Sequence, residues 1–212
     1  MNFWICFLTA GLLALPSYRS PQVLITDFEV TPGYLGGKPE IWGSAYPLSI
    51  SLSIFSPDFI PAYVHHGSCS FKLVNSPRSK ENWGSFSINL GSILDAKVDP
   101  IQIRSLDVSH YQYFTFWIRG KKGGERFKVI FRDALSRSYL PTVKYTPPQN
   151  AATPEWRQVN IPLHQLDPYS EKYEKRSLDL TQLVVVGLEF GDDAGNQRGD
   201  TLFIDDLSFR RD

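Results

Sequence analysis

From residue 23 to the C-terminus, apolar and polar residues alternate with a period of two along most of the chain. Such alternation over four to eight residues is typical of strands that bury one face. Turn residues separate the alternating runs, and no amphipathic segment of helical length lies between them. The pattern predicts an all-β fold with strands at 23–30, 69–74, 84–90, 113–120, 126–133, 156–163, 183–190 and 201–209.

Because helical crossovers are missing from this pattern, hairpins and Greek-key returns are favoured over βαβ units. We therefore expect two packed antiparallel sheets, a β-sandwich of the jelly-roll kind, in a single domain over residues 21–212. The segment 120–125, GKKGGE, predicts a tight hairpin turn with Gly123 and Gly124 at positive φ. The stretch 31–66 predicts a long loop with one further strand at 48–55, and the charged stretch 167–180 predicts a solvated loop.

Residues 3–16 form the only long apolar run, which is shorter than the roughly 20 residues that a membrane-spanning helix needs. The run predicts a signal peptide over residues 1–20, with Ala14 or Ser17 near the cleavage site, and an uncleaved N-terminal strand or anchor is the alternative. Export would place the mature protein outside the cell, in the periplasm or on the cell surface. Cys69 would then be the only cysteine, and we expect it to be a buried structural residue.

The charges limit the classes of partner. Lys and Arg together number 22, as do Asp and Glu, so the formal net charge is zero. No basic field is available to attract nucleic acid or an anionic membrane surface, and neither is expected as a partner of the mature protein.

Strand parity identifies candidate binding residues. In 113–120 the alternation turns Phe114 and Phe116 toward the core and Trp117 outward, and in 126–133 it turns Arg132 outward. An outward aromatic ring beside a guanidinium group suits the apolar face and hydroxyl rim of a sugar. The predicted ligand-binding residues are Trp117, Arg132, Asp133, Tyr145, Tyr46 and Trp83. The alternative is that the 31–66 loop covers Trp117 as a second layer of core.

Acidic residues at both ends of the domain form a second candidate site, with Asp27 and Glu29 on the first strand and Asp205 and Asp206 on the last. The terminal strands of jelly rolls usually meet, so these carboxylates could converge, and a Ca²⁺ ion would offset their repulsion. Alternatively, they cap turns or pair with basic side chains. The histidines show no metal-ligand spacing, since His65 and the adjacent residue, His66, are expected to point to opposite sides of a strand.

Several motifs, taken in order, carry a family resemblance. They are TDFEV (26–30), GGKPEIWGS (36–44), SFKLV (70–74), ENWGSFSINL (81–90), LDVSHYQYFTFWIRGKKGGERFKVIFRD (106–133), PEWRQVNIPLHQL (154–166), LDLTQLVVVGLEF (178–190) and TLFIDDLSF (201–209). Together they resemble the jelly-roll carbohydrate-binding domains of bacterial secreted proteins, especially family-11-like modules with a galactose-binding-like fold. The segment 46–66 departs from that pattern, being longer and more apolar.

The resemblance implies non-catalytic binding of a neutral glycan, and a structural calcium ion with Glu29 and Asp206 at the matching positions. Two other functions stay open, because one fold serves many functions. One is a protein-interaction or assembly-factor role. The other is a glycoside hydrolase or lyase, which needs two carboxylates roughly 5 to 10 Å apart, and for which Glu189, outward by parity, could join Asp133.

Overall fold

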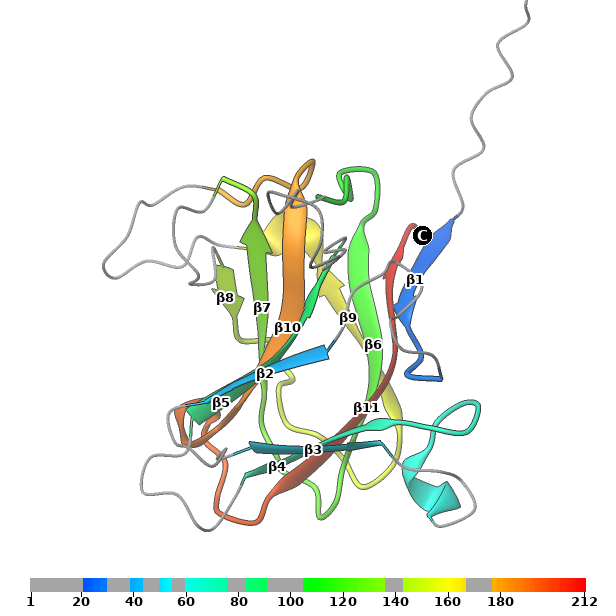
Figure 1. The fold of residues 1–212 in the computed structure, drawn as a ribbon, viewed down its shortest axis with the longest axis vertical. Helices are drawn as coiled ribbons and strands as arrows, with labels where there is room; N and C mark the ends of the chain where they lie inside the picture. Colours follow the sequence, from blue (N-terminus) through cyan, green and yellow to red (C-terminus); the bar gives the residue numbers. More distant parts are fainter. Residues whose placement is uncertain are drawn as a thin grey trace, which may run out of the picture.

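The computed structural model describes residues 21–29, 39–43, 50–54, 60–75, 83–90, 105–135, 143–166 and 177–212. These residues form eleven strands and three short 3-10 helices, and the strands make two antiparallel sheets that face each other (Figure 1). The predicted all-β sandwich is therefore confirmed. The predicted signal peptide over residues 1–20 lies outside the described residues.

The first sheet has six strands in the order β3-β4-β11-β6-β9, with β1 also paired to β11. Its strands are β1 (Gln22–Thr26), β3 (Ile50–Ile54), β4 (Phe71–Asn75), β6 (Tyr113–Gly120), β9 (Arg157–Pro162) and β11 (Thr201–Arg210). The last strand has two partners along one edge, because β4 pairs with its first part and β1 with its last part. The first and last strands are thus neighbours, as predicted.

The second sheet has five strands in the order β2-β5-β10-β7-β8. Its strands are β2 (Pro39–Gly43), β5 (Trp83–Asn89), β7 (Lys128–Asp133), β8 (Val143–Tyr145) and β10 (Leu183–Gly191), and the 3-10 helices are η1 (Pro61–Tyr63), η2 (Leu163–Gln165) and η3 (Asp192–Ala194). The predicted strand at 48–55 is present as β3. The pattern missed β2, which has Pro and Gly at its ends, and β8, which has only three residues.

Phenylalanine rings join the two sheets in the core. Phe114 of β6 meets Phe131 of β7 edge to face, with ring centroids 5.5 Å apart and planes at 79°. Phe116 meets Phe127 in the same way, at 5.7 Å and 78°. All four rings are fully buried. Edge-to-face pairs of this kind add attraction between the rings to the burial of apolar surface.

The strand pairing shows that the predicted hairpin at 120–125 is wrong. Strand β6 pairs with β11 and β9, whereas β7 pairs with β10 and β8, so the segment between β6 and β7 crosses from one sheet to the other. Gly123 and Gly124 do have positive φ, at +89° and +91°. Alternation places Phe116 and Phe127 on buried faces, but it does not distinguish strands that pair edge to edge from strands that face each other across the core.

Candidate functional site

Trp117 and Arg132 lie in different sheets, so the predicted groove that contains both is wrong. Trp117 is on β6 of the six-stranded sheet, opposite Asp205 on one side and Gln158 on the other. Arg132 is on β7 of the five-stranded sheet. The outward side chains of two packed sheets point away from each other, and the two residues therefore occupy opposite outer faces.

The other predicted ligand residues have separate environments. Tyr145 on β8 lies opposite Val129 and packs against the core, so it faces inward. Asp133 is 1% exposed, and its carboxylate accepts hydrogen bonds from the backbone N–H groups of Leu135 (3.1 Å) and Asp179 (2.9 Å). Its carboxylate therefore organises the loop before β10. Two aromatic predictions remain: Trp83 begins β5, where only its backbone is described, and Tyr46 lies outside the described residues.

The outward face of Trp117 is covered by the chain itself. The imidazole of His65 stacks on the indole with 3.8 Å between ring centroids and 18° between the planes. Trp156 meets the same imidazole edge-on at 5.6 Å. Part of the 31–66 stretch therefore covers Trp117, which is the alternative that the sequence left open, and Trp117 is half-buried beneath it.

The segment 60–68 is attached to this face by further contacts. Tyr63 stacks on Phe203 of β11, with centroids 4.2 Å apart and planes at 5°. The guanidinium of Arg119 lies over the Tyr63 ring and donates a hydrogen bond to the carbonyl of Ala62. These contacts occupy the outward side chains of Trp117, Arg119 and Phe203, so this part of the outer face of the six-stranded sheet lies beneath segment 60–68.

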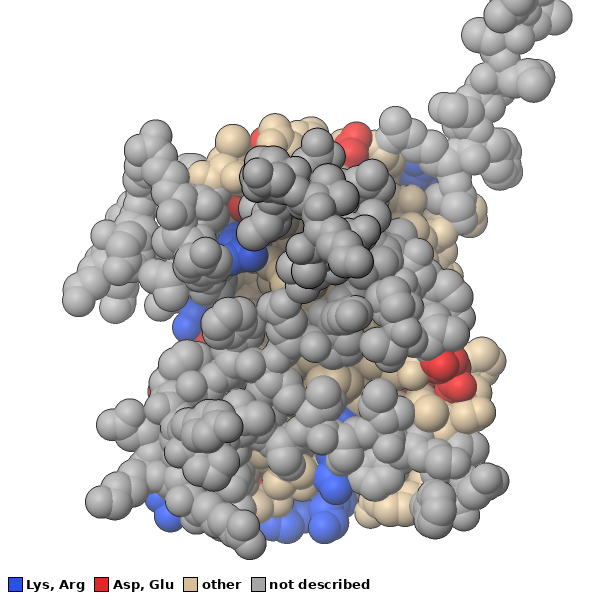
Figure 2. Space-filling model, viewed as in Figure 1, with Lys and Arg blue, Asp and Glu red and all other residues tan. Residues whose placement is uncertain are grey.

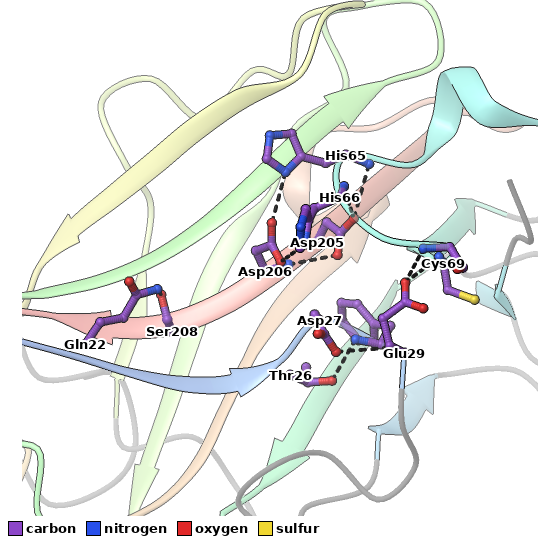
Figure 3. A network of polar contacts seen from close by, with 12 residues as sticks. Gln22, Thr26, Asp27, Glu29, His65, His66, Cys69, Asp205, Asp206 and Ser208 are labelled. Atoms are coloured by element: carbon purple, nitrogen blue, oxygen red, sulfur yellow. Dashed lines mark hydrogen bonds and ion pairs between the residues drawn. The ribbon is translucent and has the colours of Figure 1, made fainter. Parts of the chain in front are cut away.

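Carboxylates near both chain ends lie beside this segment (Figure 3). A bulge between Asp205 and Ser208 interrupts the pairing of β11, and Asp206 within it has a φ of +51°. A bulge turns consecutive side chains toward one side of the sheet. Asp205 accepts the backbone N–H groups of His65 and His66, while Asp206 accepts at 2.9 Å from Nδ1 of His65.

Both histidines approach the same carboxylate, since Nδ1 of His66 lies 3.9 Å from Oδ1 of Asp206. The expectation that their side chains point to opposite sides is wrong, because residues 65–68 form a bend and turn and not a strand. Glu29, just after β1, accepts the backbone N–H groups of Ser68 and Cys69. The carboxylates thus fasten the residues before β4 to β1 and β11.

Two observations bear on calcium at this carboxylate cluster. Burial and the negative charge of Asp206 raise the pKa of Asp205 to about 8, against the opposing effect of its backbone hydrogen bonds, and a bound cation would relieve that repulsion. However, no group of three or more His, Cys, Asp or Glu side chains converges as a metal site in the described part of the chain. Glu29 and Asp205 hold neighbouring backbone groups of residues 65–69, but the four carboxylates do not form one metal site, and calcium there remains a prediction.

Cys69 belongs to the same region and is half-buried, not fully buried as expected. Burial raises the pKa of its thiol, and the carboxylates of Glu29, Asp205 and Asp27 raise it further. The thiol is therefore held in its neutral form at neutral pH, which does not suit a nucleophile.

The outer face of the five-stranded sheet carries a different group of charges. Glu189 of β10 is only 3% exposed, although alternation turns it away from the core. Its carboxylate lies 2.6 Å from Nζ of Lys144 and 3.2 Å from Nζ of Lys128. Basic side chains are visible beside β7 and β8 in Figure 2. We call these three residues the charged triad. The sequence showed Glu189 as outward but missed the triad, because β8 was not recognised.

Small residues lie next to the triad in the middle of the same face. Gly187 of β10 pairs with Ser87 of β5 and with Ile130 of β7. A Cβ atom at Gly187 would collide with the carbonyl oxygen of Phe86, so the close approach of β5 and β10 requires glycine there. Ser87 and Ile130 beside Gly187 are only 4% and 5% exposed, so the centre of this face is buried and the partly exposed lysines of the triad lie at its side.

Glu189 and Asp133 do not form a catalytic pair. Glu189 is opposite Lys128 at one end of β7, whereas Asp133 is opposite Leu183 at the other end. Five residues of rise along a strand separate two such positions by about 17 Å. That is too far for the two carboxylates of a glycoside hydrolase.

The two-sheet antiparallel sandwich is also the fold of known carbohydrate-binding modules. The chain belongs to the carbohydrate-binding domain 30 family, whose model matches residues 101–211, just over half of its 212 residues. It is a non-catalytic carbohydrate-binding domain by family, and the predicted class is confirmed. No curated protein matches the chain.

Solved structures share the fold. The family 30 module of the cellulosomal cellulase Cel9D-Cel44B of Clostridium thermocellum is 17% identical, with a TM-score of 0.59 over 90% of this chain and 98% of that one. Another family 30 module is 19% identical, with a TM-score of 0.61 over 90% and 88%. A family 11 module of Clostridium thermocellum, solved with a β-1,3-1,4-mixed-linked tetrasaccharide, is 12% identical, with a TM-score of 0.57 over 90% and 95%.

Proposed function

We propose that this chain binds a neutral β-linked glucan on the outer face of its five-stranded sheet and does not cleave it. The observation that carries the proposal is the charged triad, in which Glu189 lies 3.2 Å from Lys128 and 2.6 Å from Lys144, whose side chains are partly exposed. A carboxylate accepts hydrogen bonds from sugar hydroxyls, and ammonium groups donate to them.

The opposite face suits a sugar less well, because the Trp117 surface is already stacked against His65. The β-linked glucan class is proposed from relatives of the same fold: one was solved with a mixed-linked tetrasaccharide, and another comes from a cellulase. A neutral chain is proposed because the protein has no net charge. Binding without cleavage is proposed because Glu189 and Asp133 lie at opposite ends of β7.

Export is part of the same proposal, since polysaccharides of this kind lie outside the cell. The apolar run at residues 3–16 supports it. Among the residues that the structure describes, none form a helix with the length and apolar character needed to cross a bilayer.

The test is affinity electrophoresis and calorimetry with mixed-linkage β-glucan, hydroxyethylcellulose, xylan and galactomannan. We expect the two glucans to bind with a Kd of about 10 μM to 1 mM, because an open face buries few ligand atoms. Lys128→Ala and Arg132→Ala should each weaken binding by about tenfold, which corresponds to about 1.4 kcal/mol. The matched control is Lys72→Ala on β4, which removes a charge from the other sheet and should leave binding unchanged.

Two results would contradict the proposal. Weakened binding in Lys72→Ala, with Lys128→Ala and Arg132→Ala silent, would move the site to the six-stranded sheet. A folded wild-type protein that binds none of the four polysaccharides would exclude neutral β-glucans as its ligands. Thermal melting of each variant separates loss of binding from loss of fold.

A further inference from the structure

Glu189 has more positive partners than its charge requires. Its side chain is turned away from the core, yet the residue is only 3% exposed. A buried carboxylate is unfavourable unless a positive group compensates it. One ammonium group is enough to balance its charge, but Glu189 has two, from Lys128 on β7 and Lys144 on β8. The two lysines can therefore have different roles.

The two lysines contact the carboxylate differently. Nζ of Lys144 lies 2.6 Å from Oε2 of Glu189, and Lys144 takes part in at least one further interaction. Nζ of Lys128 lies 3.2 Å from Oε1, but among the described residues Oε1 accepts no hydrogen bond. The contact of Lys128 with Glu189 is therefore one of charge, and the N–H groups of Lys128 are not directed at the carboxylate.

Strand pairing places the triad on one face. Lys128 is directly opposite Glu189, and Lys144 on the next strand is opposite Ile130, which shares a face with Lys128 because it lies two positions further along β7. The side chains of Lys128 and Lys144 are 28% and 24% exposed, against 4% for Glu189. The lysines are thus the members of the triad that a ligand on this face meets first.

We propose that Lys128 is the ligand-contacting lysine of the charged triad and that Lys144 is a positioning residue, which acts through Glu189. Lys144 holds Oε2 and so fixes the carboxylate. The fixed carboxylate in turn holds the ammonium group of Lys128 in place by its charge, and the N–H groups of Lys128 donate to oxygens of the ligand. This inference rests on the proposed function, since the ligand is the glycan on this face.

A double-mutant cycle, with affinity for mixed-linkage β-glucan as its readout, tests the two roles. Lys128→Ala should weaken binding about tenfold and Lys144→Ala about threefold. In the Lys128→Ala background, Lys144→Ala should have no further effect, because Lys144 acts only through Lys128. Lys144→Arg keeps a cation within reach of Oε2 and should bind like the wild type. The matched control is Lys122→Ala, which removes a 65% exposed lysine between β6 and β7 and should also leave binding unchanged.

A second measurement tests the positioning without any glycan. NMR of isotopically labelled lysine side chains reports the mobility of each side chain on a fast timescale. The end of the Lys128 side chain should be more mobile in Glu189→Gln and in Lys144→Ala than in the wild type. The side chain of Lys122 should be equally mobile in all three proteins. Glu189→Gln changes only one oxygen to nitrogen, so this test remains available if Lys144→Ala does not fold.

The two measurements separate a failure of this inference from a failure of the proposed function. A wild type that binds no glycan, with Lys128 mobile in both variants, would refute the proposed function and still support the positioning of Lys128. A wild type that binds glucan, with Lys128 equally mobile in all proteins, would overturn the positioning role and leave the proposed function intact. The inference is also overturned if Lys144→Ala weakens binding as much in the Lys128→Ala background as alone, because Lys144 would then contact the glycan itself.

Discussion

The imidazole of His65 lies flat on the indole of Trp117, with 3.8 Å between the ring centroids. Strand parity places Trp117 outward from the sandwich, yet this contact occupies the aromatic surface that a sugar ring would need. The His65 ring is itself held by a 2.9 Å contact between its Nδ1 and the carboxylate of Asp206. Trp117 is therefore part of the packing between β6, β11 and segment 60–68.

Trp117→Ala should lower the stability of the fold and leave glycan affinity within about twofold of the wild type. A fully buried Trp costs roughly 3 to 5 kcal/mol when truncated to Ala, and the half-buried Trp117 should cost about 2 kcal/mol. Urea unfolding measures the first effect, and calorimetry with mixed-linkage β-glucan measures the second. Lost binding in a variant of wild-type stability would instead make Trp117 a sugar contact.

The fold could be predicted because alternation is a local property of the chain. Strands such as Tyr113–Gly120 and Thr201–Arg210 can be recognised because apolar residues, mainly Phe, Ile and Leu, recur along them with a period close to two. Which strands share a sheet is a non-local property, and here the sequence misled, since β6 and β7 face each other across the core. The three-residue strand β8 is too short to show a period at all.

Asp133→Ala should destabilise the protein by about 2 kcal/mol, because it removes a buried acceptor and leaves the N–H group of Asp179 without its partner. Asp133→Asn keeps one acceptor oxygen and should cost less. Urea unfolding would measure both changes, with the exposed Asp193→Ala as the control. Wild-type stability in Asp133→Ala, combined with weaker glycan binding, would restore the predicted ligand role of Asp133.

Calcium should bind at the cluster of Asp27, Glu29, Asp205 and Asp206 and raise the melting temperature of the protein. The physical reason is that burial and, after it, the charge of Asp206 raise the pKa of Asp205 to about 8, and a cation that binds the folded state would stabilise these carboxylates. The measured quantity is the difference in melting temperature between millimolar calcium and EGTA. The difference is compared, and not the melting temperature itself, because Glu29→Ala also removes the hydrogen bonds from Ser68 and Cys69 and so lowers stability without any effect on calcium.

In Glu29→Ala and in Asp206→Ala the calcium-dependent difference should shrink, while in Asp193→Asn it should equal that of the wild type. A wild-type difference that both cluster variants retain in full would show that the carboxylates are compensated by His65 and by backbone N–H groups alone.

The candidate sites were harder to predict than the fold, for a reason that His65 illustrates. Its partners Trp117 and Asp206 are 52 and 141 residues away along the chain, and only the bulge in β11 brings them to one place. That Glu29 and Asp206 lie in one region could be expected, because they lie at the first and last strands, which pair here. The charged triad could not be expected, since Lys144 comes from β8, which is too short to be recognised by alternation.

The purified protein should release no reducing ends from β-glucan, xylan or mannan. Hydrolysis of a glycosidic bond requires an acid and a second carboxylate on either side of it, and the outward Glu189 has two lysines as its partners. Asp133 cannot supply the second group, because it lies at the other end of β7 and its carboxylate is held by backbone N–H groups.

A reducing-sugar assay over many hours, with Glu189→Gln and Asp133→Asn alongside the wild type, decides the point. Glu189→Gln should weaken glycan binding because it removes the charge that holds the triad, and the basal release should stay at the level of a buffer control in all three proteins. Sustained release by the wild type that disappears in Glu189→Gln would establish an enzyme on this sandwich, with Glu189 as one of its carboxylates.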